Sequence, residues 1–378
     1  MIKWFDSKFI SSMPRLTDTR GGLVDALNAL LVNGFNPKSV ISLSYDNGVC
    51  TLDVGVGHGF IKHSVIVINN SEQIALNNLE FRVDIVKETT IGFKVATPIA
   101  NEAGLLVKYA ALGFEQHFNS DGRSCYKSPN PEYPAYLRVD DKTQFTTSST
   151  HSKFAGVELC LNMTDFDTAE WQAPYDAANP LRNRKATDKT GWFKWYYAAN
   201  NVPNNSVVPF SAERRYMLVG NSDYFWLIIY PYGLGATDSG YAAVYGFALV
   251  DYGDRLQQSL IATNVDINPH ISFINAHTPE NGTVVVGSNK TYCALQSNPL
   301  RSIKTQSNVN FEFAVFSFDK KLLFRDAIYL YDGLEIKARF SGITTSSINM
   351  DGDNILSVGA ISRIASTGQY YALALDLE

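Results

Sequence analysis

Short segments that alternate apolar and polar residues recur along this chain, and they constrain its fold more than any other feature. The clearest group runs from Leu52 to Val95, where LDVGVGHGF, SVIVIN, LEFRVDIV and IGFKVA follow one another with turn residues between them. A period of two residues is typical of strands that bury one face. We therefore expect residues 37–100 to form a small β-module.

One helical signal precedes this module. Leu23, Leu27 and Leu30 recur at helical spacing, with Thr19 as a candidate N-cap and Gly34 as a stop, so a helix is expected over 19–34. A helix of about four turns is marginal alone, so its apolar stripe must dock on another surface, with the module as the obvious candidate. The preceding residues 1–16 fit a simple edge strand slightly better than an arm that packs on a neighbour.

Strand-like segments continue at short intervals beyond Pro98, and no long helical pattern alternates with them. This order favours antiparallel sandwiches or barrels. The predicted fold is mainly β, with an N-terminal arm and one short helix over 1–36, the small β-module over 37–100, and a larger antiparallel sandwich-like or barrel-like region over 101–378. That last region is long enough for two subdomains.

Composition excludes several classes of partner. A net charge of −5 argues against a general nucleic-acid binder, which needs a basic surface to neutralise phosphates. The longest apolar run, Tyr224 to Tyr230, is too short to cross a bilayer, so no membrane span is expected. Because the cysteines are widely scattered and no secretory signal is visible, we expect buried free thiols and synthesis in a reducing cytosol. The cysteines are Cys50, Cys125, Cys160 and Cys293.

No catalytic, cofactor or metal motif accompanies these elements. Gly55, Gly57 and Gly59 invite comparison with a phosphate loop, but a strand pattern follows them where a helix would be needed, so a tight turn is predicted. His58 and His63 lack a third ligand at suitable spacing. Paired acids of the kind that a glycan hydrolase needs are present, but the sequence does not show the separations that such a reaction requires. The pair in Asp351 to Asn354 is better explained as a β-turn with solvated acids. The paired acids are Asp140, Asp141, Asp165, Asp167, Asp351 and Asp353.

Basic residues alternate with aromatic ones between Arg182 and Tyr196. Such a mixture can bind sugars or single-stranded nucleic acid, although a solvated loop that leads into a Trp-containing strand is the default interpretation. The candidate ligand contacts in this segment are Trp192, Trp195 and Tyr196.

Several segments together resemble virion structural proteins of tailed bacteriophages, of the tail or minor-tail type. The segments are MIKWFDSKF at the start, GGLVDALNALLVNGF in the helix, the HGF turn, LNNLEFRV and TTIGFKV. The resemblance continues through LRVDD at Leu137 to Asp141, RYMLVGN at Arg215 to Asn221, and DGLEIKAR at Asp332 to Arg339. The LPGLY run that usually follows this last segment in the family is FSGIT here.

The resemblance implies a structural component of a phage particle without enzymatic activity, most readily a tail or tail-tip protein in several copies. Its partners would be other virion proteins and copies of itself, and its location the virion after synthesis in the bacterial cytoplasm. On this hypothesis the arm and the helix dock the subunit on a neighbour. The candidate assembly contacts are Trp4, Phe5, Phe9, Leu23, Leu27 and Leu30. A module that binds host-surface glycan, and less readily a glycan hydrolase, are the alternatives.

Overall fold

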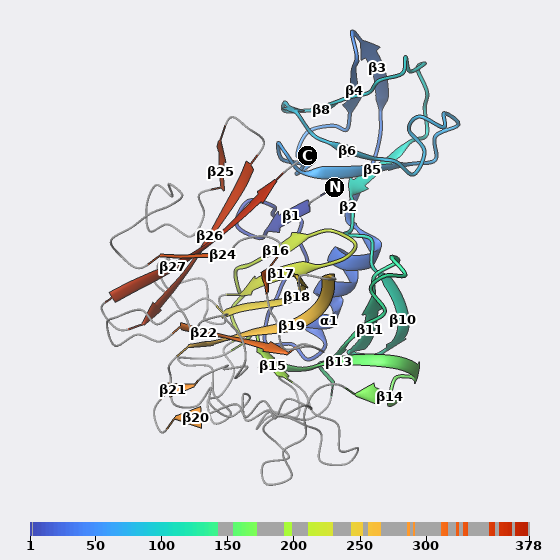
Figure 1. The fold of residues 1–378 in the computed structure, drawn as a ribbon. Coiled ribbons are helices and arrows are strands. Elements are labelled where there is room, and N and C mark those ends of the chain that lie inside the picture. The colour runs from blue at the N-terminus through green and yellow to red at the C-terminus, as the bar shows by residue number, and fades with distance from the viewer. Residues whose placement is uncertain are drawn as a thin grey trace.

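The computed structural model describes Met1, residues 3–142, 154–171, 193–198, 211–229, 243–251 and 256–265, and strands β20 to β27 between residues 286 and 376. The predicted mainly-β fold is confirmed, because these residues form antiparallel sheets and one short helical segment (Figure 1). The described part of the chain contains no helix long and apolar enough to cross a membrane.

Residues 35–109 form the β-module, a sandwich of two four-stranded sheets. One sheet has the order β2 (Phe35–Ser39), β9 (Leu106–Tyr109), β5 (Val65–Asn69) and β6 (Glu80–Arg82). The other has the order β3 (Ser42–Asp46), β4 (Val49–Asp53), β8 (Thr90–Lys94) and β7 (Ile85–Val86). The Phe81 and Phe93 rings join the two sheets, with centroids 4.5 Å apart. Because β9 belongs to the first sheet, the module extends beyond residue 100.

The hairpin of β3 and β4 turns at Asn47 and Gly48. Both residues have positive φ, 47° and 83°, as a two-residue type I′ turn requires. This turn matches the twist of the flanking strands and fixes their register, with Asp46 opposite Val49. Figure 1 shows this hairpin at the outer end of the module, away from the rest of the molecule.

The predicted helix lies at 22–33, as the α-helix α1 (Gly22–Leu27) continued by a π-helical segment (Asn28–Asn33). The predicted cap at Thr19 is wrong, since no side-chain cap closes the N-terminus from within the segment. The Leu23 amide instead donates to Asp141 Oδ2 at 3.1 Å. Asp141 directly follows the strand Tyr136–Asp140. Gly34 ends the segment with φ 70°, so the predicted glycine stop is confirmed.

Two further sheets pack around this helix (Figure 1). The first has the order β10 (Glu115–Ser120), β11 (Arg123–Lys127), β12 (Tyr136–Asp140), β13 (Phe154–Asp165) and β14 (Thr168–Trp171), and β15 (Phe193–Tyr196) also pairs with β13. The second has the order β1 (Lys3–Asp6), β16 (Tyr216–Gly220), β17 (Phe225–Ile229), β18 (Ala243–Asp251), β19 (Leu256–Val265) and β22 (Phe311–Phe316), with β23 (Leu323–Phe324) on β18.

The remaining described strands lie nearer the C-terminus. A four-stranded antiparallel sheet has the order β24 (Ile328–Tyr331), β27 (Thr367–Asp376), β26 (Ile355–Ile364) and β25 (Ile348–Asp351), and β20 (Val286–Gly287) pairs with β21 (Lys290–Thr291).

Strand β1 has its partner far along the chain. It pairs antiparallel with β16, so residues 3–6 and 217–220 share a sheet.

Candidate interaction surface

The N-terminal arm is built into the subunit itself. Phe5 is fully buried, and its ring lies 5.5 Å from Phe35 and 6.5 Å from Tyr109. Trp4 is buried as well, whereas Phe9 is 42% exposed. The structure therefore differs from the prediction that the arm presents an apolar surface to a neighbour, because β1 completes the sheet of β16 and buries the same side chains internally.

The helix residues that were predicted as assembly contacts are also buried inside the subunit. Leu23, Leu27 and Leu30 are fully buried within one hydrophobic core. The Tyr126 hydroxyl donates to Asn28 Oδ1 at 2.7 Å, which seats the helix on β11. The apolar stripe docks on the subunit's own sheets, so it offers nothing to a neighbouring subunit.

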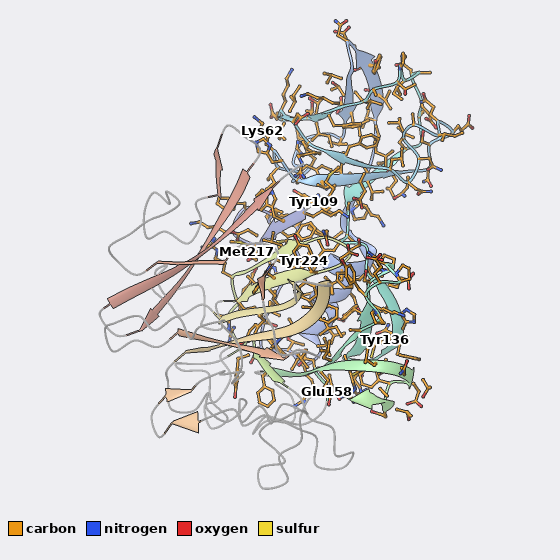
Figure 2. All side chains as sticks on the ribbon, viewed as in Figure 1. Lys62, Tyr109, Tyr136, Glu158, Met217 and Tyr224 are labelled. Atoms are coloured by element: carbon orange, nitrogen blue, oxygen red, sulfur yellow. The ribbon has the colours of Figure 1, made fainter. Side chains whose placement is uncertain are left out.

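Two ion pairs hold the arm in place. Arg215 donates to Asp6 Oδ2 at 2.7 Å, and Lys3 Nζ lies 2.5 Å from Glu80 Oε1. Lys3 also donates to the Ala111 carbonyl oxygen. Burial lowers the pKa of Lys3 below its usual value, and the attraction of Glu80 only partly opposes this. The arm therefore joins the β-module to the sheet of β16, which belongs to the body of the molecule, that is, the sheets and the helix outside the module. Tyr109 lies at this junction (Figure 2).

The two predicted ligand contacts that the structure describes, Trp195 and Tyr196, do not form an accessible aromatic surface. Trp195 and Tyr196 are fully buried, and the Trp195 ring stacks on Tyr245 at 5.5 Å. The Tyr196 amide donates to the Tyr245 hydroxyl at 2.8 Å. These two residues serve the core, which corrects the prediction; Trp192 and the basic segment 182–192 lie outside the described residues.

The glycine-rich turn before β5 is confirmed as a turn, since Gly55, Gly57 and Gly59 all have positive φ. His58 holds it closed. The Phe60 amide donates to His58 Nδ1 at 3.0 Å, so the ring proton is assigned to Nε2, which lies 2.9 Å from the Lys87 carbonyl oxygen. Both ring nitrogens of His58 are therefore occupied by structural hydrogen bonds. Within the described residues, no group of three His, Cys, Asp or Glu side chains is placed to hold a metal.

Four of the six acids that a hydrolase would need are engaged in structural contacts. Asp141 accepts from the Tyr197 hydroxyl at 2.6 Å as well as from Leu23. Asp165 accepts from the Asp167 amide at 2.8 Å, at the turn between β13 and β14. Asp140 and Asp167 contact arginines in the cluster described next. Asp351 lies in β25, and Asp353 lies outside the described residues.

A buried charged cluster covers one face of the sheet of β11 to β13. Arg138 of β12 lies opposite Glu158 of β13, with Nη1 2.5 Å from Oε2, and both residues are fully buried. Figure 2 labels Glu158 in this sheet. The Phe166 ring lies against the guanidinium groups of Arg123 and Arg138, at 3.7 and 4.5 Å from its centroid. The Arg138 guanidinium is therefore both stacked on an aromatic ring and paired with carboxylates. These contacts join β12, β13 and the turn at Phe166 and Asp167, so the cluster serves the fold.

The cysteines follow the predicted pattern where the structure describes them. Cys50, Cys125 and Cys160 are buried free thiols, and burial raises the pKa of Cys50 to about 12. A thiol with so high a pKa is a poor nucleophile at neutral pH. Cys293 lies outside the described residues.

Exposed apolar side chains gather on the β-module instead. Of the eight large apolar residues exposed in the described part of the chain, six belong to the module. These six are Ile41, Val56, Ile74, Leu79, Ile85 and Val86. Single exposed apolar residues are ordinary on a protein surface, but six of them in one small module make that module the candidate interaction surface of the described residues.

Ile74, which is 92% exposed, stands on a loop that hydrogen bonds make rigid. Glu102 accepts from the Ser71 hydroxyl at 2.7 Å and from the Glu72 amide at 2.5 Å. Gln73 pairs with the backbone of Ala100 in both directions, donating at 2.9 Å and accepting at 2.8 Å. The loop therefore presents an apolar side chain in a fixed position, which lowers the entropic cost of a contact.

Sequence patterns did not reveal this surface. Ile74 follows a polar run, NNSEQ, that reads as a turn, and Ile41 stands at the corner between β2 and β3. The only available signal was a large aliphatic residue in a polar segment. In the isolated subunit such a residue stays exposed and does not contribute to the hydrophobic core.

Comparisons with known proteins add little to this geometry. No protein-family model matches the chain, and no curated protein matches it. Among solved structures, the Phage phi92 endosialidase matches with 7% sequence identity, over 90% of this chain and 51% of that chain, at a TM-score of 0.16. The chain thus spans about half the length of that protein. A likeness at this TM-score carries no argument about the fold or the function of the chain.

Proposed function

We propose that this chain is a non-enzymatic structural subunit of a tailed-bacteriophage particle, part of its tail or tail tip and present in several copies. The chain is made in the bacterial cytoplasm and is incorporated into the virion through contacts of the β-module. Its partners are copies of itself and other virion proteins. The sequence resemblance to tail-type virion proteins suggests the setting, and the exposed apolar side chains of the module indicate the surface that acts there.

The observation that carries this proposal is the rigid presentation of Ile74. An isoleucine that is 92% exposed loses apolar contact with protein in the isolated subunit, and burying it against a partner is favourable by about 2 kcal/mol. The bonds of Glu102 and Gln73 fix the loop before any partner arrives. A polar residue would serve equally well at this position if the loop were only a connection.

Particles purified by density gradient test the proposal. Quantitative mass spectrometry should detect this chain in several copies per particle, with the amount unchanged after a high-salt wash. Its absence from particles, while it is present in the lysate, would contradict the proposal. Release of oligosaccharide from host polysaccharide by the purified protein would contradict the non-enzymatic part.

Substitutions on the module connect the site to incorporation. Ile74→Asp should lower the copy number in particles by about tenfold without lowering the melting temperature, because one exposed anchor worth about 1–2 kcal/mol is lost. Asn101→Asp is the matched control, since it adds the same charge at an exposed position of the same module. Equal incorporation of the two variants would show that Ile74 does not contact a partner in the particle.

The glycan-binding alternative is not favoured by any observation on the described residues. Two of its three candidate contacts, Trp195 and Tyr196, lie in the core. A sugar ring needs an exposed aromatic face for stacking, and these two side chains have none.

A further inference from the structure

The four edge strands of the β-module differ in how they are protected against pairing. β6 and β7 have three and two residues, which is too short to extend a sheet effectively. β2 contains Pro37 and a register shift between Phe35 and Lys38. Short strands, proline and bulges are common devices that block an exposed edge. β3 has five residues, SLSYD, with regular pairing on β4 and none of these devices.

The outer edge of β3 carries main-chain groups with no partner strand in the described part of the chain. Asp46 and Val49 close the two-residue turn, so they form a hydrogen-bonded pair, and Ser44 with Thr51 forms the next one. The N–H and C=O groups of Leu43 and Tyr45 therefore point away from β4. A free edge of this kind recognises an extended strand.

We propose that a second copy of this chain pairs with β3, strand against strand and antiparallel, about a two-fold axis that passes beside Ser44. This inference rests on the proposed multi-copy role and names one contact within it. Leu43 then bonds with Tyr45 of the partner subunit, and Tyr45 bonds with Leu43 of the partner subunit. The two four-stranded sheets become one sheet that continues across both copies. Isologous contacts of this kind are the usual way in which identical subunits pair.

The side chains of β3 suit this register. Ser44 faces Ser44 of the partner subunit, and both are small. Ser42 faces Asp46 of the partner subunit, so a hydroxyl donor meets a carboxylate and like charges stay apart. Ser42, Ser44 and Asp46 are all exposed in the isolated chain, so no core residue has to move.

Exposed apolar residues flank the same edge. Ile41, directly before β3, is 67% exposed, and Val56 is 71% exposed. Ile41 lies next to Gly55, the residue before Val56, since a Cβ built on Gly55 would lie 3.5 Å from Ile41 Cδ1. In the paired form the Asn47–Gly48 turn of the partner subunit lies beside Ile41, which loses exposure. Backbone bonds and apolar burial therefore act at the same place.

A cysteine at the axis tests the pairing and its register. Ser44 and its symmetry mate form a non-hydrogen-bonded pair, with Cα atoms about 4.5 Å apart, within the range that a disulfide spans. Ser44→Cys, made in the full chain with Cys293→Ser, should form a disulfide-linked dimer under mild oxidation. Ser42→Cys is the matched control, because Ser42 faces Asp46 of the partner subunit, so it should cross-link at least about tenfold more slowly.

Charge at position 42 provides a second test that does not depend on oxidation. Ser42→Lys should tighten the dimer and Ser42→Asp should weaken it, each by about threefold or more in dissociation constant, because position 42 faces Asp46 of the partner subunit twice in the dimer. Sedimentation velocity measures both constants. The difference between the variants should shrink in about 0.5 M NaCl as screening increases.

The outcomes separate this inference from the proposed function. A disulfide-linked dimer of the Ser44→Cys variant, together with opposite effects of the two charge variants, supports strand pairing. A monomer with Ser44→Cys, equal cross-linking by Ser42→Cys, or a cross-link only to another virion protein would overturn pairing between copies. If the chain is nevertheless counted in purified particles, the proposed function stands while this contact is rejected. Absence from particles would reject the proposed function instead.

Discussion

At the scale of single residues, Arg138 is a fully buried cation that pairs with carboxylates of the same sheet. It is fully buried and lies 2.5 Å from Glu158 and 3.1 Å from Asp167. Burial alone would lower the pKa of Arg138, but the facing carboxylates of Glu158 and Asp140 raise it above its ordinary value. The group stays charged, and its partners need that charge.

Removing this charge should be costly. Arg138→Met should lower the free energy of unfolding by about 3–5 kcal/mol, because the Glu158 carboxylate is left buried and uncompensated. The double variant Arg138→Met with Glu158→Leu should recover much of the loss. Denaturant unfolding gives the values. Lys142→Ala is the control, since its ion pair with Asp121 is exposed and should contribute about 0–1 kcal/mol. Equal losses from Arg138→Met and Lys142→Ala would contradict the assignment.

Glu102 makes the Ile74 loop sensitive to acid. Burial opposes ionisation, but hydrogen bonds from Gln73, the Glu72 amide and Ser71 together outweigh it and lower the pKa of Glu102 below its usual 4.5. A depressed carboxylate pKa stabilises the folded loop above the unfolded value, and this contribution is lost as the pH falls through the folded value.

Hydrogen exchange can follow this dependence. Protection of residues 71–77, corrected for intrinsic rates, should be constant near neutral pH and should fall as the pH drops below about 4.5, where the unfolded carboxyl begins to bind its proton. Glu102→Gln should flatten this response. A loop whose protection is the same at about pH 3 and about pH 7 in the wild-type protein would contradict the role of the carboxylate.

At the scale of elements, the end of the helical segment depends on Gly34. Its φ of 70° is unfavourable for other residues, and a Cβ there would clash with the Tyr109 carbonyl oxygen. Gly57 has a similar φ of 67° with open space around it. Gly57→Ala should therefore cost about 1 kcal/mol from backbone strain alone. Gly34→Ala should cost at least about twice as much, since β9 must also move. Thermal unfolding of both variants measures the difference in stability. Equal losses of stability would show that β9 can shift away from the added Cβ at no cost in free energy.

Local patterns located the elements but not their partners. The leucines at 23, 27 and 30 placed the helix, and the alternation between Leu52 and Val95 placed the strands of the module. The cap of that helix comes from Asp141, 118 residues away from Leu23. No local signal marks such a contact. Likewise, the sequence around Trp195 and Tyr196 does not indicate whether these side chains face solvent or the core.

At the scale of the whole molecule, the arm links parts that the sequence separates. Asp6 and Arg215 are 209 residues apart and share a buried ion pair, while Lys3 reaches Glu80 in the module. The sequence supports an edge strand at 1–16, but the choice between a neighbour and the same chain depends on long-range pairing, which periodicity does not encode. The exposed positions of Ile41 and Ile74 escaped prediction for the opposite reason, since single exposed side chains leave no periodic pattern in the sequence.

Deleting residues 1–13 should therefore unfold the subunit and not merely detach it from the particle. The deletion removes β1 and the buried side chains of Phe5, Ile10 and Met13, each worth about 1.5–3 kcal/mol, from a protein whose total stability is on the order of 5–15 kcal/mol. Circular dichroism and a solubility assay should show loss of cooperative unfolding. Phe9→Ser, at an exposed position of the same arm, should have little effect. A truncated chain with unchanged melting temperature would restore the view of the arm as a docking segment.

Hydrogen exchange of this chain, free and within purified particles, tests most directly whether the β-module is the contact surface. The account predicts that incorporation increases protection at residues 41–46, 71–78 and 85–86. Exchange in β1, residues 3–6, and in the helical segment, residues 22–31, should stay slow in both states because the free subunit already buries most of these residues. Increased protection confined to these two segments, with the module unchanged, would contradict the account.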